Sequence, residues 1–147
     1  MDETQANETI MFYLDPELRN RVAAGNAFLA NNKKRAGVKT TASGIQYEVL
    51  KDAQGAKPKA TDTVVVNYRG TLINGTEFDA SARTGKPIEF PLNRVIRGWT
   101  EGLQLMPVGS KYKFYIPYNL GYGLNGPGQI PGGATLIFEV ELLDIKK

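Results

Sequence analysis

The 147-residue sequence contains no histidine and no cysteine. Without cysteine the chain cannot form a disulfide, and without either residue it cannot form a Cys/His zinc site. A Ser-His-Asp triad and a thiolate nucleophile are excluded as well. Histidine is also the only side chain whose unperturbed pKa lies near neutrality, so the usual proton carrier is missing. An enzyme with this sequence must work without the common reactive groups, and any metal site would have oxygen ligands only.

The sequence also lacks a strong excess of charge and a long apolar run. Its net charge of +3 comes from 18 basic and 15 acidic residues. Residues 1–60 carry nine basic and seven acidic side chains, and residues 61–147 carry nine and eight. Because neither part is a polybasic arm, we expect no nucleic-acid partner. No run approaches the roughly 18 apolar residues of a membrane span, so we expect no such span.

A secretion signal is missing from the first residues. Residues 1–12 begin with Asp2 and Glu3 and have neither the basic nor the apolar region of a signal peptide. We therefore expect a periplasmic protein if a signal peptide has been removed, and a cytoplasmic one otherwise.

Two parts of different character meet near residue 37. We expect a mostly helical N-terminal extension over residues 1–36, in which Asp15 is the N-cap and Pro16 takes the first helical position. Lys33-Lys34-Arg35 and Gly37 indicate its C-terminal end, with the basic cluster solvated. Two interpretations remain open: a helix that binds a partner or dimerises, and a surface helix that packs on its own domain. The apolar stripe at helical spacing contains Leu14, Leu18, Val22 and Leu29, with Phe28 alongside.

Residues 37–147 have the pattern of one α+β domain. Turn residues become dense, since 13 of the 16 glycines fall at or after Gly55. The apolar period changes to two, and Asn74-Gly75 is a hairpin signal. We expect an antiparallel sheet with one short helix over residues 95–102. The expected strands cover residues 45–50, 63–70, 88–92, 111–117 and 135–145.

Ten of the fourteen aromatic residues lie after residue 60, several of them near the predicted strand ends. A single aromatic residue on a strand is usually part of the core. Together with the carboxylates of Glu77 and Asp79 and the long loop 120–133, these residues could instead line an apolar pocket. Asp79 is then either a pocket acid or a turn former. The aromatic candidates are Tyr68, Phe78, Phe90, Trp99, Tyr122 and Phe138.

Several motifs in a fixed order add a family resemblance. They are Val66-Asn67-Tyr68-Arg69-Gly70, Asn74-Gly75-Thr76-Glu77-Phe78-Asp79, Val95-Ile96-Arg97-Gly98-Trp99-Thr100-Glu101-Gly102, Gly121-Tyr122-Gly123 and the run from Ala134 to Leu142. From about Ser43 to Ile145 the sequence resembles the FKBP-type peptidyl-prolyl isomerases. The segment Phe28–Lys34 resembles the linker of long bacterial members related to the macrophage infectivity potentiator. About 35 residues precede the domain here, too few for the dimerisation unit of those members, so we expect a monomer.

The resemblance implies a half-open antiparallel β-sheet wrapped around a short helix, with a proline pocket between them. Tyr68, Asp79 and Tyr122 would be the catalytic residues, and Trp99 would form the pocket floor. The Ile96 amide and the Tyr122 hydroxyl would hold substrate carbonyls, while Asp79 would act electrostatically at the rim. Ile88 stands where many members have an aromatic residue. The implied substrate-binding residues are Phe78, Ile88, Phe90, Val95, Ile96, Trp99, Ile130 and Phe138.

The implied activity is cis-trans isomerisation of X-Pro bonds, with proline-containing polypeptides as substrates and no cofactor or metal. Macrolides of the tacrolimus and rapamycin type are the expected small-molecule ligands. A second interpretation is a peptide-binding or chaperone module on the same fold with little turnover.

Overall fold

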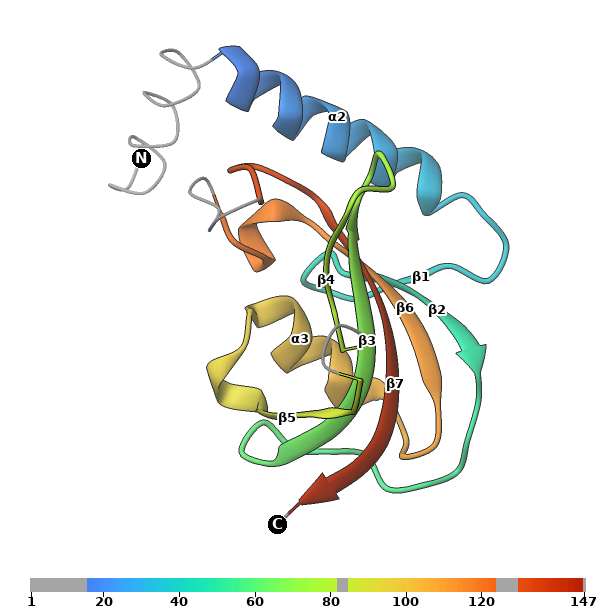
Figure 1. Cartoon of the computed structure of the whole chain (residues 1–147). Helices are drawn as coiled ribbons and strands as arrows, with labels where there is room; N and C mark the ends of the chain where they lie inside the picture. Colours follow the sequence, from blue (N-terminus) through green and yellow to red (C-terminus); the bar gives the residue numbers. More distant parts are fainter. Residues whose placement is uncertain (1–15, 82–84, 124–129, 147) are drawn as a thin grey trace.

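One antiparallel sheet organises the chain in the computed structural model, which describes residues 16–81, 85–123 and 130–146 (Figure 1). Its strands run in the order β1-β2-β6-β7-β3-β4, and β5 pairs with a second stretch of β3. The C-terminal strand β7 therefore lies inside the sheet, between β6 and β3. The strands are β1 (Lys39–Thr40), β2 (Gln46–Lys51), β3 (Thr63–Leu72), β4 (Glu77–Ala80), β5 (Ile88–Pro91), β6 (Lys111–Ile116) and β7 (Leu136–Lys146).

The two α-helices in the described ranges lie at different places on this sheet. In Figure 1, α2 (Pro16–Asn32) crosses one end of the sheet, and α3 (Arg97–Gly102) lies against one face of it. Three short 3₁₀ turns complete the described elements: η2 (Leu92–Arg94), η3 (Leu103–Leu105) and η4 (Tyr118–Leu120). None of the helices in the described ranges has the length and apolarity that a membrane crossing requires.

The expected α+β architecture is confirmed, and each expected strand is present within two residues of its predicted ends. The hairpin at Asn74-Gly75 is also present: Gly75 has φ +89°, and the Leu72 amide donates to the Thr76 carbonyl at 2.9 Å. The short helix begins at Arg97 rather than at Val95, because Ile96 has an extended backbone and serves as the N-cap. The two-residue strand β1 was not expected, since so short a pairing leaves no period in the sequence.

Close packing holds α3 on the sheet. A methyl group added at Gly98 would lie 2.6 Å from Cγ2 of Ile116, and one at Gly102 would lie 2.8 Å from Cε1 of Phe114. Glycine at these two positions therefore lets the helix backbone approach β6. The core around this contact is fully apolar and includes Val64, Val66, Leu103, Met106 and Leu142.

Helix α2 packs on its own domain, in agreement with the second of the two interpretations of this segment. The predicted stripe is confirmed where it is described, because Leu18, Val22 and Leu29 are buried. At the end of the helix, the side-chain amide of Asn32 donates to the side-chain oxygen of Gln46 at 2.9 Å. The side-chain amide of Gln46 in turn donates to the backbone carbonyl of Leu29 at 2.8 Å. The other expected residues of the stripe and cap, Leu14 and Asp15, lie outside the described residues.

The basic cluster after α2 is exposed, as predicted, but Arg35 also makes contacts that were not predicted. Half of its side chain is exposed, and its guanidinium pairs with Glu48 and donates to the Tyr115 hydroxyl at 2.8 Å. Burial, reinforced by the Glu48 carboxylate, raises the pKa of Tyr115. Arg35 therefore ties the end of α2 to strands β2 and β6, a contact that depends on tertiary structure and has no local sequence pattern.

Candidate active site

A cavity of about 280 Å³ opens between the start of α3 and the inner face of the sheet. Its lining residues come from strands β3, β4, β5 and β7, from the segment that leads into α3, from α3 itself and from the segment after η4. Eight of the eleven site residues predicted above line it, together with Arg94. The lining residues are Tyr68, Asp79, Phe90, Arg94, Val95, Ile96, Trp99, Tyr122 and Phe138.

Trp99 sits at the centre of the aromatic cluster. The sequence places it in the first turn of α3, where it is 4% exposed. Its ring packs edge-on against three other aromatic rings. The distance between ring centroids is 5.2 Å to Tyr68 and 5.3 Å to both Phe90 and Phe138. Its indole Nε1 is buried and finds no hydrogen-bond partner among the described residues. Among the described residues the indole is therefore positioned by aromatic contacts rather than by a hydrogen bond.

Tyr68 and Asp79 form a hydrogen-bonded pair at the rim. They come from the adjacent strands β3 and β4, and the Tyr68 hydroxyl donates to Oδ2 of Asp79 at 2.6 Å. The other carboxylate oxygen accepts the Ala80 amide at 2.9 Å. The Asp79 carboxylate therefore faces the cavity while it also bonds the local backbone, which combines both interpretations of this residue.

Tyr122, from the segment after η4, lines the same cavity and is 37% exposed. Burial, with a smaller contribution from the Asp79 charge, raises the pKa of Tyr122 above its ordinary value. A tyrosine hydroxyl is protonated at neutral pH even at that ordinary value, so it can donate a hydrogen bond to a carbonyl in the cavity.

The backbone before α3 contributes a further side of the cavity. Val95 and Ile96 are both extended, with ψ of 176° and 150°, and the Ile96 carbonyl accepts the amides of Trp99 and Thr100. This turn brings both side chains to the cavity. Arg94, the last residue of η2, lines the cavity but was not predicted. Its only signal in the sequence is that it directly precedes Val95-Ile96.

Three predicted site residues do not line this cavity. Phe78 is buried behind the wall, with its ring edge-on to Phe138 at 5.5 Å. Ile88 lies two residues from Phe90 on β5, a step of about 6.6 Å along a strand, and borders a different surface hollow. Ile130 is buried, 9% exposed, at the start of a described range. Their roles in substrate binding stay predictions.

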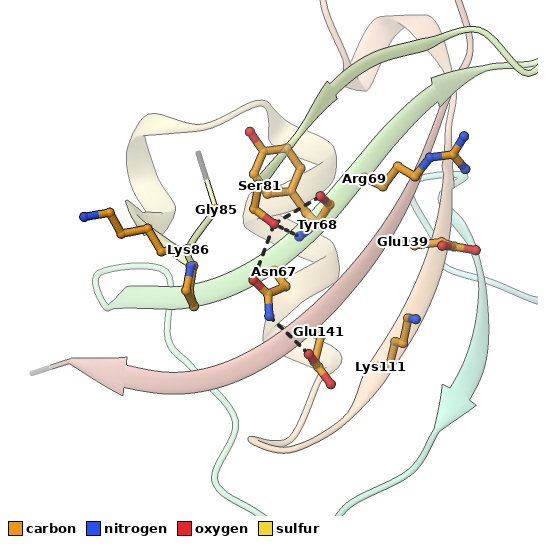
Figure 2. Close-up of a pocket in the computed structure, with 10 residues that line it drawn as sticks. Asn67, Tyr68, Arg69, Ser81, Gly85, Lys86, Lys111, Glu139 and Glu141 are labelled. Atoms are coloured by element: carbon orange, nitrogen blue, oxygen red, sulfur yellow. Dashed lines mark hydrogen bonds between the residues drawn. The ribbon is translucent and has the colours of Figure 1, made fainter. Parts of the chain in front are cut away.

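A second, larger hollow of about 530 Å³ lies on the other side of β3 (Figure 2). Asn67 and Arg69 reach it, because side chains alternate along a strand and Tyr68 between them faces inward. Charged side chains of both signs line it, and Lys111 stands opposite Glu141 in the register of β6 and β7. The side-chain amide of Asn67 donates to the Glu141 carboxylate at 3.3 Å, and the Ser81 hydroxyl accepts the backbone amide of Tyr68 at 3.0 Å. Charged and polar residues predominate in this lining, so the smaller aromatic cavity is the candidate active site.

In the ranges that the structure describes, no three acidic side chains are grouped to hold a metal ion.

Comparison with known families now identifies the fold. Residues 54–143 match the family model described as FKBP-type peptidyl-prolyl cis-trans isomerase. The chain belongs to this family. Residues 2–49 match a second model, the domain amino terminal to FKBP-type peptidyl-prolyl isomerase. The resemblance drawn from the sequence motifs is therefore confirmed, and the cavity lies within the FKBP-type domain.

Individual relatives agree with this assignment. The chain is 53% identical over 145 residues to the isomerase FkpA of Aeromonas hydrophila, covering 99% of this chain and 54% of the relative. It is 47% identical over 126 residues to the outer membrane protein MIP of Legionella longbeachae, covering 85% of this chain and 54% of the relative. The chain thus spans just over half the length of these curated relatives.

Solved structures share the fold. The crystal structure of FkpA from Escherichia coli matches with a TM-score of 0.87 at 39% identity, over 99% of this chain and 74% of that one. A peptidyl-prolyl cis-trans isomerase from Pseudomonas syringae matches with a TM-score of 0.83 at 38% identity, over 88% of this chain and 96% of that one.

Proposed function

We propose that the chain catalyses cis-trans isomerisation of X-Pro bonds in unfolded or partly folded polypeptides. The observation that carries this proposal is the aromatic cavity, in which Trp99 forms a dry floor and Tyr68, Asp79 and Tyr122 bring polar groups to the rim. Membership of the FKBP-type family supports it.

The chemistry needs desolvation more than it needs a reactive group. Rotation about an X-Pro bond faces a barrier of ~18–20 kcal/mol that arises from amide resonance. Resonance is strongest when water solvates the negative charge on the carbonyl oxygen. An apolar cavity walled by Trp99, Phe90 and Phe138 disfavours that charge-separated form and so favours the twisted amide. No bond is broken, and no general acid, base or nucleophile is required.

Hydrogen bonds at the rim hold the flanking peptide while the bond turns. The Tyr122 hydroxyl, which is protonated at neutral pH, is the proposed donor to one substrate carbonyl. The Ile96 amide is the proposed donor to another. The Asp79 carboxylate, fixed by the Tyr68 hydroxyl, adds a negative charge at the rim. Each factor of ten in rate needs about 1.4 kcal/mol, so a few such contacts suffice.

The expected substrates bind briefly and with little sequence demand. Burying a proline ring removes on the order of 100 Å² of apolar surface, worth about 2.5 kcal/mol. A millimolar complex already requires roughly 4 kcal/mol. Macrolides of the tacrolimus and rapamycin type, with more apolar area, are proposed as tighter ligands of the same cavity. We further propose that the chain acts as a monomer in the cell envelope; the similarity to an outer membrane protein of Legionella longbeachae supports this location.

A refolding assay tests the activity. The chain at catalytic concentration should accelerate the slow, proline-limited refolding phase of an unrelated protein, and a rapamycin-type macrolide should abolish the effect. The fluorescence of Trp99, the single tryptophan, should change on macrolide binding. Binding of unfolded protein without acceleration would favour the peptide-binding module instead. Absence of both acceleration and a fluorescence change would contradict any role for this cavity.

A further inference from the structure

Helix α2 contacts the segment that leads into β7, far from it in sequence. The Arg21 guanidinium donates from Nη1 to the Gly132 carbonyl at 2.6 Å. One residue on, a methyl group at Gly133 would lie 2.8 Å from Val22 and 2.9 Å from Leu18, and Gly133 has φ +76°. On the helix side, a methyl group at Gly25 would overlap the Thr135 hydroxyl. A glycine on each side lets helix and segment approach this closely.

The same segment is hydrogen-bonded to the backbone that carries Tyr122. The Gly133 amide donates to the Gly123 carbonyl at 2.7 Å. The Gly123 amide in turn donates to the Tyr118 carbonyl at 2.9 Å, as does the Gly121 amide at 3.1 Å. Tyr122 therefore stands between two residues whose backbone positions are fixed, and one of these positions depends on Gly133.

From these contacts we infer that Arg21 is a positioning residue for the active site: it braces residues 132–133 and, through Gly123, sets the placement of the Tyr122 hydroxyl at the cavity rim. Arg21 is partly exposed, and its hydrogen bond goes to Gly132, which does not line the cavity. Its effect on the reaction, which rests on the proposed isomerase function, therefore passes through Tyr122. Helix α2 becomes part of the catalytic unit rather than an appendage.

Arg21→Met tests the brace, because it removes the donor and keeps the aliphatic stem. We expect kcat/KM for a short proline peptide to fall about five- to tenfold, well below the ~100-fold that a 1 Å misplacement can cost. Arg21→Lys, which keeps a charged donor, should recover most of the loss. Arg19→Met is the matched control, since Arg19 is exposed on the same helix, and it should leave kcat/KM unchanged.

A double-mutant cycle decides whether Arg21 acts through Tyr122. In the Tyr122→Phe background, Arg21→Met should change kcat/KM by less than about twofold, since coupled residues are not additive. An equal loss in both backgrounds would overturn the inference. A loss in Arg21→Met that Arg21→Lys does not recover would overturn it too.

Amide hydrogen exchange supplies a readout that does not depend on activity. Exchange at Gly133 should be faster in Arg21→Met than in the wild type or in Arg19→Met. Gly25→Ala, whose methyl group would push the helix away from Thr135, should also accelerate exchange at Gly133. This variant replaces Arg21→Met in the test if Arg21→Met does not fold. Unchanged exchange at Gly133 would overturn the brace even in an active enzyme. Faster exchange in a chain without isomerase activity would leave the brace intact and reject the proposed function and, with it, the role of Arg21 in catalysis.

Discussion

The two tyrosine hydroxyls at the cavity rim differ in hydrogen bonding and in exposure. The Tyr68 hydroxyl is engaged, because it donates to Asp79 at 2.6 Å. Tyr122 is more exposed, and both burial and the Asp79 charge raise its pKa. The Asp79 carboxylate thus accepts the first hydroxyl and, together with burial, raises the pKa of the second. This difference fits the proposal that Tyr122 is the hydroxyl that binds the substrate.

Removal of the Tyr122 hydroxyl should lower the activity and leave the stability of the fold almost unchanged. In Tyr122→Phe we expect kcat/KM to fall about tenfold, equivalent to the ~1.4 kcal/mol of one hydrogen bond to a substrate carbonyl. The free energy of unfolding should change by less than about 0.5 kcal/mol, because the ring is partly exposed. Peptide isomerisation and urea unfolding measure the two quantities.

Tyr47→Phe is the control for this change. The Tyr47 ring stacks on the Tyr112 ring, with 5.8 Å between the ring centroids, and Tyr47 does not line the cavity. Its hydroxyl should therefore not affect turnover. Equal activity of Tyr122→Phe and the wild type would show that the hydroxyl does not bind the substrate.

At the scale of elements, α3 is placed by its glycines as much as by its apolar residues. Gly98 and Gly102 face Ile116 and Phe114 on β6, one helical turn apart. Their lack of side chains brings the helix axis close to the sheet, which sets the depth of Trp99 between them. The cavity therefore depends on two residues that do not line it.

Gly98→Ala tests this close contact, because the contact determines whether the substitution raises or lowers the free energy of unfolding. In an exposed helix, replacing Gly with Ala stabilises by about 1 kcal/mol. Here the new methyl group would lie 2.6 Å from Ile116, so we expect destabilisation by about 1–3 kcal/mol from overpacking. Urea unfolding measures the change. Gly→Ala stabilisation at this site would mean that α3 is not tightly packed on β6.

The junction between α2 and the sheet should respond to alkaline pH. The raised pKa of Tyr115 means that the folded state keeps this proton above pH 10 while the unfolded state loses it. The free energy of unfolding should then be independent of Tyr115 below about pH 10 and fall above it, by about 1.4 kcal/mol per pH unit. Tyr115→Phe should reduce this slope. Urea titrations of both proteins at pH 7–11 test it, and equal slopes above pH 10 would contradict the buried setting of the hydroxyl.

Local patterns predicted the elements better than they predicted contacts between elements. Strands 63–70 and 111–117 could be placed because alternation of apolar residues is a local property, as is the hairpin signal at Asn74-Gly75. The aromatic candidates were inferred from their places in the sequence, and the family resemblance gave them their expected roles. The contacts of Arg35 and the position of Arg94 were missed because they depend on how distant segments meet. The same reason explains why Ile88 does not line the cavity: it shares a face with Phe90 but lies too far along β5.

For the molecule as a whole, the missing histidines have a direct consequence. No side chain with an unperturbed pKa between 6 and 8 exists anywhere in the 147 residues. The proposed mechanism also transfers no proton. We therefore expect kcat/KM to vary by less than about twofold between pH 6 and 8, measured on a peptide whose own ionisation does not change there. A bell-shaped profile in this range would contradict a mechanism based on desolvation.

The central place of β7 governs when this fold can assemble during synthesis. Residues 136–146 fill the gap between β6 and β3, and β3 was made some seventy residues earlier. Until the ribosome releases β7, β3 and β6 expose unpaired edges, and the stripe on α2 lacks Thr135 and Gly133 to cover it. Non-local pairing of this kind is slow and exposes apolar surface. The nascent chain therefore passes through a long period in which it resembles the unfolded clients proposed for it, and is itself open to capture by other chaperones.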